Sequence, residues 1–120
     1  NVAANGTNGR IDAGNDIVAF SSSDKRLKEN IKPLDNALDK VSKISGVEFD
    51  WKPLTKEEKK TIHGNEGHDV GVIAQEIEEV LPEVVQTRDT GYKAVKYEKI
   101  VPLLIEAIKE LKEEIEELKK

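Results

Sequence analysis

Apolar residues recur at coiled-coil spacing in the last quarter of the chain. Successive members lie 3, 4, 3, 4 and 3 residues apart, in the order Val101, Leu104, Ile108, Leu111, Ile115 and Leu118. This is a heptad pattern with β-branched residues at position a and leucine at position d. A helix that packs only on its own domain needs a wider apolar stripe, whereas after Ala107 nearly every remaining residue is Lys or Glu. The pattern favours a parallel coiled coil within a C-terminal helix of residues 98–120, in which Glu114 and Lys119 of neighbouring chains can pair.

Two shorter patterns upstream predict a helix followed by a strand. Apolar residues over 34–44 recur at helical spacing, with Asp35 as the expected N-cap and Gly46 as the expected C-terminal stop. Residues 47–51 then alternate between apolar and acidic, which is the period-two pattern of a half-buried strand. The two aromatic residues that we expect this strand to place in the core are Phe49 and Trp51.

The middle of the chain predicts a polar loop followed by short elements. Residues 53–69 are polar and contain one proline and two glycines, so we expect an exposed loop. A short helix over 74–81 ends where Pro82 begins, because proline cannot continue a helix. The turn sequence Asp89-Thr90-Gly91 predicts a hairpin. The predicted strands in this region are 70–73, 83–87 and 92–97, and together the elements predict a small α+β domain.

Residues 1–22 differ from the rest of the chain. They contain three charged residues, whereas the chain as a whole is 36% charged. Asn5-Gly6 and Asn8-Gly9 are strong signals for tight turns, and Ile11 and the apolar run 17–20 predict short strands. So short a piece does not fold alone. We interpret residues 1–22 as the end of a longer β-rich structure and residues 23–120 as a separate domain.

Composition indicates that the domain depends on partner subunits. The 120 residues are 37% hydrophobic and only 4% aromatic, and a small domain already buries a low fraction of its surface. Such a chain forms a thin core and gains from oligomerisation. The sequence therefore predicts that part of the apolar core lies between chains.

Charge and residue content exclude several classes of protein. The net charge of −5 disfavours binding to phosphate backbones, so we expect no nucleic-acid partner. The absence of cysteine excludes disulfides and thiolate chemistry, and no apolar run is long enough to cross a membrane. Four polar residues of the loop could be imagined as a metal site but are more simply solvated; they are His63, Glu66, His68 and Asp69. We expect no cofactor and no metal.

One hexapeptide, residues 23–28, combines a serine with a lysine five positions later. A serine hydroxyl is a weak nucleophile until a base removes its proton. A lysine can be that base when it is neutral, a state favoured by burial or by a nearby positive charge, which Lys25 or Arg26 could supply. Spacing alone is a weak signal, since a serine near a lysine is usually part of a solvated loop.

The surrounding motifs make the chain similar to a known family over residues 23–120. The pattern Ser-Asp-x-Arg-Leu-Lys-x-Asn-Ile at 23–31 resembles the start of the intramolecular chaperone domain of phage tailspikes and tail fibres, classed as peptidase S74 and known from endosialidase tailspikes. The resemblance continues in the same order along the chain. Its further blocks are Gly-Val-Glu-Phe-Asp-Trp (46–51), Val-Gly-Val-Ile-Ala-Gln-Glu (70–76), Leu-Pro-Glu-Val-Val (81–85) and Val-Lys-Tyr (95–97).

The resemblance implies a specific function. Domains of this family trimerise, align three copies of the upstream fibre, and then cut themselves off before the serine. Carried onto this sequence, Ser23 is the nucleophile, Lys28 is the general base, and the scissile bond is Ser22–Ser23. The implied partners are two further copies of the chain and the upstream fibre segment. The implied locations are the virion tail for the mature fibre and the host cytoplasm for the released domain.

Two alternatives stay open at this stage. The a/d rule by itself favours a two-stranded coiled coil for this combination of residues, whereas the family resemblance implies a homotrimer. The second alternative concerns activity. A trimerisation module that does not cleave itself and stays attached to its fibre would show the same heptads. The presence of both Ser23 and Lys28 favours the self-cleaving serine endopeptidase.

Overall fold

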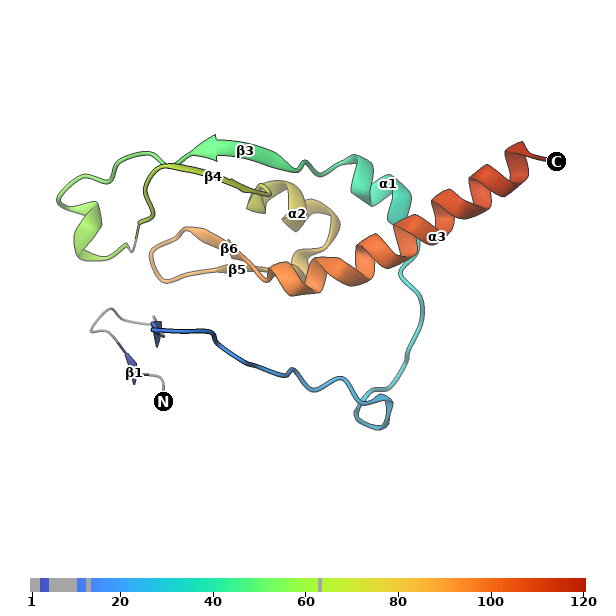
Figure 1. The fold of residues 1–120 in the computed structure, drawn as a ribbon, viewed down its shortest axis with the longest axis horizontal. Coiled ribbons are helices and arrows are strands. Elements are labelled where there is room, and N and C mark those ends of the chain that lie inside the picture. The colour runs from blue at the N-terminus through green and yellow to red at the C-terminus, as the bar shows by residue number, and fades with distance from the viewer. Residues whose placement is uncertain (1–2, 5–10, 13, 63) are drawn as a thin grey trace. The chain divides into compact units, whose positions relative to one another are not determined.

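The computed structural model describes residues 3–4, 11–12, 14–62 and 64–120, and the chain divides into two compact units, Asn1–Lys32 and Pro33–Lys120. In the first unit, β1 (Ala3–Ala4) pairs antiparallel with β2 (Ile11–Asp12). The chain then runs extended to a 3-10 turn at Lys25–Leu27 (Figure 1). The turns predicted at Asn5-Gly6 and Asn8-Gly9 lie outside the described residues.

The strand predicted over residues 17–20 is wrong. This segment is extended but belongs to no strand of the described chain. Its apolar side chains point into solvent, with Ile17 64% and Phe20 94% exposed. An extended segment becomes a strand only by pairing its backbone with a neighbour, and within the described residues this segment has none.

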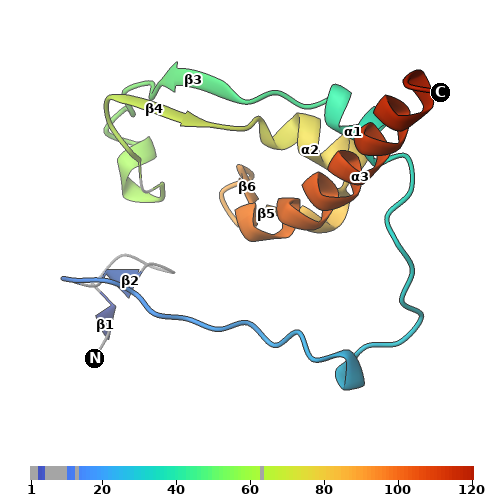
Figure 2. The same cartoon turned by 45° about the vertical axis from the view of Figure 1, so that its right-hand side comes forward.

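The second unit is the predicted mixture of helices and short strands, and the α+β class is confirmed. Figures 1 and 2 show β3 and β4 as one antiparallel hairpin and β5 and β6 as another, beside the helices. Its elements are α1 (Ala37–Ser42), β3 (Val47–Asp50), β4 (His68–Gly71), α2 (Ala74–Val80), β5 (Val85–Thr87), β6 (Lys93–Val95) and α3 (Val101–Leu118).

The core of this unit is small and lies where the three helices meet. Its largest fully buried side chains are Ile77 of α2 and Leu103 of α3, each 1% exposed. The other buried apolar residues of the described chain are Ala37, Leu81, Val84, Ile100 and Ala107. Among the described residues, no polar or charged residue is buried as a whole. A single chain therefore forms the thin core that the composition predicts.

The prediction that Phe49 and Trp51 belong to this core is wrong. Trp51 is 38% exposed, and Phe49 is only partly buried outside the core cluster. The two rings pack edge to face with centroids 4.9 Å apart, and Trp51 Nε1 donates a hydrogen bond to Asp69 at 3.0 Å. The reason is that β3 pairs only with β4 among the described strands, so its apolar face is not enclosed as in a packed sheet.

The helix predicted over residues 34–44 starts later than expected. The structure begins α1 at Ala37, so Asp35 is not its N-cap. Asn36 occupies that position with a left-handed backbone (φ 49°), and its side chain makes no capping hydrogen bond. The cap comes from Glu110 on α3, whose carboxylate accepts hydrogen bonds from the backbone nitrogens of Ala37 at 2.7 Å and Leu38 at 3.2 Å. Local sequence rules could not find a cap that lies 73 residues away.

Gly71 allows a close approach between β4 and the segment that precedes α3. The Tyr97 hydroxyl accepts a hydrogen bond from the Val72 backbone nitrogen at 3.2 Å. A Cβ atom on residue 71 would lie 2.6 Å from that hydroxyl oxygen, which is too close for contact. The absence of a side chain at position 71 therefore lets Tyr97 join the hairpin to the start of α3.

We expect Gly71→Ala to lower the free energy of unfolding by roughly 1–3 kcal/mol, because Tyr97 must move and its hydrogen bond is lost. Thermal unfolding followed by circular dichroism measures the effect. Gly46→Ala is the matched control, since a Cβ there meets nothing within 4 Å. Equal melting temperatures for the two variants would show that Tyr97 moves aside without cost.

Candidate functional site

A capped 3-10 turn determines where the side chain of Lys28 lies. Asp24 is the N-cap of this turn, and its Oδ1 accepts a hydrogen bond from the Arg26 backbone nitrogen at 2.8 Å. Backbone hydrogen bonds from Leu27 to Asp24 (3.0 Å) and from Lys28 to Lys25 (3.1 Å) close the turn. Because a 3-10 turn shortens the chain, it returns Lys28 toward the residue that precedes the cap.

That residue is Ser23, and its side chain contacts Lys28. The distance from Lys28 Nζ to Ser23 Oγ is 2.7 Å, with both residues exposed. This lies within the reach needed for proton transfer between a nucleophile and its base. The Ser22–Ser23 peptide bond immediately precedes the turn, and Ser22 is also exposed. The local turn thus brings together the two residues that the sequence analysis singled out for catalysis.

Asp24 and Arg26 form an ion pair within the same turn. Arg26 Nε and Nη2 donate to the two carboxylate oxygens of Asp24, the shorter contact being 2.9 Å. Hydrogen bonds from Arg26 lower the pKa of Asp24, and the Asp24 carboxylate in turn raises the pKa of Arg26. An exposed pair of this kind contributes little stability, but it orders the turn. The Arg26 charge is therefore engaged by Asp24 instead of lying alone beside the lysine.

α3 has two apolar faces, of which only one packs on its own domain. Leu103 and Ala107 are buried against the core, at 1% and 5% exposure. The six heptad residues are all at least 42% exposed; they are Val101, Leu104, Ile108, Leu111, Ile115 and Leu118. The helix therefore packs one face on its own domain and still leaves the heptad seam in solvent.

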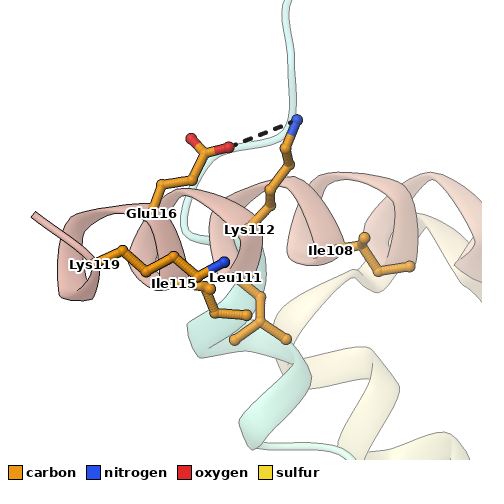
Figure 3. Close-up of a pocket in the computed structure, with 6 residues that line it drawn as sticks. All are labelled: Ile108, Leu111, Lys112, Ile115, Glu116 and Lys119. Atoms are coloured by element: carbon orange, nitrogen blue, oxygen red, sulfur yellow. Dashed lines mark ion pairs between the residues drawn. The ribbon is translucent and has the colours of Figure 1, made fainter.

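Part of this seam forms an open groove of about 340 Å³ along the last turns of α3. Figure 3 shows Leu111 and Ile115 projecting on the same side of the helix, with Ile108 one turn before them. Lys112 and Glu116 flank the groove and lie 3.8 Å apart as an ion pair, and Lys119 also lines it. An apolar surface with a charged border is typical of a helix interface.

His68 was expected in the polar loop, but the structure places it in β4. Its ring nitrogens contact Asp50 Oδ1 at 2.9 Å and Glu48 Oε1 at 3.0 Å, both from β3. These hydrogen bonds raise the pKa of His68, with a smaller contribution from the charge of Asp69. No group of residues in the described parts of the chain has the arrangement of a metal site. His63 lies outside those parts.

We expect the His68 ring to titrate above pH 6.5, because two carboxylates stabilise its charged form. A raised folded-state pKa means that this stabilisation is complete below the unfolded pKa and is lost as pH rises through the folded value. Two-dimensional NMR of the imidazole protons measures the midpoint. Asp50→Asn removes one carboxylate and will lower the midpoint, whereas an unchanged midpoint would show that the contact does not persist in solution.

Gln75 and Glu76 close the motif block at residues 70–76. Both lie in the first turn of α2. Gln75 is exposed, whereas Glu76 Oε1 is buried and has no hydrogen-bond partner in the described structure.

The family model of peptidase S74, described as the chaperone of endosialidase, matches residues 23–86, which is more than half of the chain. The chain therefore belongs to this family, and the resemblance stated from its motifs is confirmed. No helix among the described residues is long and apolar enough to cross a membrane.

Similar proteins include long tail fibre proteins of bacteriophages. The long tail fibre protein Gp37 of Enterobacteria phage K3 is 41% identical over 105 residues, covering 82% of this chain but 8% of that protein. Gp37 of Enterobacteria phage Ox2 is 36% identical over 110 residues, covering 88% of this chain and 42% of that protein. The chain thus spans less than half the length of these relatives.

Proposed function

We propose that residues 23–120 are an intramolecular chaperone that assembles a phage tail fibre or tailspike as a homotrimer and then releases itself by autoproteolysis at Ser22–Ser23. The observation that supports this best is the position of Ser23. The family match begins at Ser23, the residue whose hydroxyl oxygen lies 2.7 Å from Lys28 Nζ. The relatives of the chain are tail fibre proteins. Residues 1–22 are then the end of the fibre that the domain serves.

The exposed seam of α3 supports assembly into more than two chains. Ile105, at heptad position e, is 48% exposed beside the a and d residues. In this first heptad the apolar surface available to partner helices is therefore wider than the narrow seam of a two-stranded coiled coil, although the residues at a and d alone favour a dimer. A wider sector suits a helix that faces two neighbours. We therefore favour the trimer.

The chemical step follows from the Ser23–Lys28 contact. The neutral amine of Lys28 takes the proton from Ser23 Oγ, which attacks the carbonyl carbon of Ser22. The C–N bond breaks, the Ser23 nitrogen receives the proton, and an ester joins the Ser22 carbonyl to Ser23 Oγ. Water then hydrolyses this ester to give a carboxylate at Ser22 and restores the Ser23 hydroxyl.

Assembly would control this step through the charge of the lysine. In the single chain both residues of the dyad are exposed to water, and only a neutral amine can accept a proton. Burial in the assembled trimer favours the neutral amine. Cleavage would then wait until the three chains have come together.

A chaperone of this design solves a kinetic problem. Interwoven β fibres depend on contacts between residues far apart or on different chains, and such contacts form slowly. Joining three chains at one end raises their local concentration and aligns them. After cleavage the fibre stays folded behind its unfolding barrier, in the virion tail, while the released domain remains in the host cytoplasm.

The test is the mass of freshly expressed protein under two conditions. Light scattering gives the native mass, expected at about three times the 13.4 kDa of one chain before the domain separates. Denaturing mass spectrometry is expected to find fragments 1–22 and 23–120. A monomer would contradict the proposal as a whole. An uncut trimer would leave a trimerisation module that stays attached to its fibre.

A further inference from the structure

The carboxylate of Glu110 joins α3 to the first turn of α1. Its Oε2 accepts a hydrogen bond from the Ala37 backbone nitrogen at 2.7 Å, and its Oε1 accepts one from Leu38 at 3.2 Å. A carboxylate with both oxygens on backbone N–H groups makes charge-assisted hydrogen bonds, which are stronger than neutral ones. This contact spans 73 residues of sequence.

Nothing else in the described chain caps this end of α1. The Asn36 side chain makes no capping bond, and Ala37 is 0% exposed. Water therefore has little access to the Ala37 nitrogen, and a buried donor without a partner is unfavourable. Glu110 thus satisfies the N–H groups at the first turn of α1, close to the point where Leu34 packs against the core.

The two ends of this contact belong to different parts of the proposed mechanism. Lys28 lies nine residues before Ala37, so the dyad is held on a tether that reaches at most about 30 Å from its anchor. On the other side, Glu110 immediately precedes Leu111, a residue of the exposed seam. The anchor of the tether is therefore attached to the helix that carries the seam.

We propose that Glu110 is a positioning residue for self-cleavage, because it fixes the end of the dyad-bearing tether to the trimerisation helix. The inference rests on the proposed function and adds a connection between assembly and cleavage. Without the carboxylate, the first turn of α1 opens and the tether becomes longer and less directed. Because small losses of orientation reduce rates strongly, we expect cleavage to slow roughly tenfold while the trimer persists.

The experiment follows cleavage of the newly translated full chain on denaturing gels, for wild type and four variants. Glu110→Ala removes the acceptor, and Glu110→Asp keeps the charge but is one methylene shorter. Glu110→Gln keeps one oxygen that can still accept a hydrogen bond. The matched control is Glu113→Gln, which removes a charge from an exposed position of the same helix.

We expect the cleavage rate to be highest for wild type, lower for Glu110→Gln, and lowest for Glu110→Asp and Glu110→Ala. Glu113→Gln should be cut at the wild-type rate. Light scattering and melting temperatures, measured in a Ser23→Ala background, show whether each variant is a folded trimer at the assay temperature. Hydrogen exchange at Ala37 and Leu38 shows whether the first turn of α1 has opened. If the variants only lowered stability, their cleavage rates would rank as their melting temperatures do and not in this order.

Three results would overturn the inference. One is a Glu110→Ala trimer that is cut at the wild-type rate. Another is unchanged hydrogen exchange at Ala37 and Leu38 in all Glu110 variants. If Glu110→Ala does not fold, Glu110→Gln provides the comparison. The inference is then overturned if Glu110→Gln is cut at the wild-type rate although its hydrogen exchange at Ala37 and Leu38 is faster. Wild-type chain that forms trimers but stays uncut would contradict the proposed function as well, so the two failures are distinguishable.

Discussion

Lys28→Met and Ser23→Ala will each leave the chain uncut, with the cleavage rate reduced by at least about 10³-fold. The first variant removes the base, and the second removes the nucleophile. Methionine has a chain of similar length to lysine but no amine, so the turn at residues 25–27 can still form. Denaturing gels of freshly expressed protein measure the ratio of intact chain to fragments 1–22 and 23–120.

The matched control for this experiment is Lys32→Met. Lys32 is an exposed lysine four residues beyond Lys28, and the hydroxyl of Ser23 receives its hydrogen bond from Lys28. We expect Lys32→Met to be cut like wild type. Fragments from Lys28→Met at the wild-type rate would show that another group removes the proton. Fragments from Ser23→Ala would show that the nucleophile is another residue, and the adjacent serines would be examined next.

Ile108→Asp will prevent trimer formation and, as a consequence, cleavage. Ile108 is 67% exposed in the single chain, so the substitution should leave the fold of one chain intact. In a trimer with an a/d seam, however, three copies of this residue face one another. Three unpaired carboxylates in an apolar interface each cost several kcal/mol, whereas each buried isoleucine contributes about 1.5–3 kcal/mol.

The measurement is native mass by light scattering, together with circular dichroism for helix content. We expect a mass near 13.4 kDa, nearly unchanged circular dichroism and no fragments. Lys109→Asp is the control, because it introduces the same side chain at the neighbouring exposed position and perturbs only a surface ion pair with Glu106. Cleavage of a monomeric Ile108→Asp chain would show that assembly does not control the reaction, and a trimeric Ile108→Asp would exclude this seam.

Local patterns determined most of the secondary structure. The heptad spacing predicted α3, the turn signal at Asp89-Thr90-Gly91 predicted the β5–β6 hairpin, and Pro82 marked the end of α2. The resemblance of residues 23–31 to a family motif, and not their spacing alone, singled out Ser23 and Lys28, the pair that the turn brings to 2.7 Å. These features depend on interactions within a few residues, such as i to i+3 hydrogen bonds and capping by Asp24, so a single sequence contains the information.

Only the tertiary structure decided the features that depend on distant partners. It showed that Trp51 remains partly exposed because no described layer encloses its face of the β3–β4 hairpin, and that residues 17–20 do not pair. It also revealed that α3 buries Leu103 and Ala107 while its heptad seam stays in solvent. The cap on α1 is the clearest case. Local rules predicted Asp35 as the cap. The capping hydrogen bonds go instead to Glu110, because helix packing brings its carboxylate to two N–H groups that are far away in sequence.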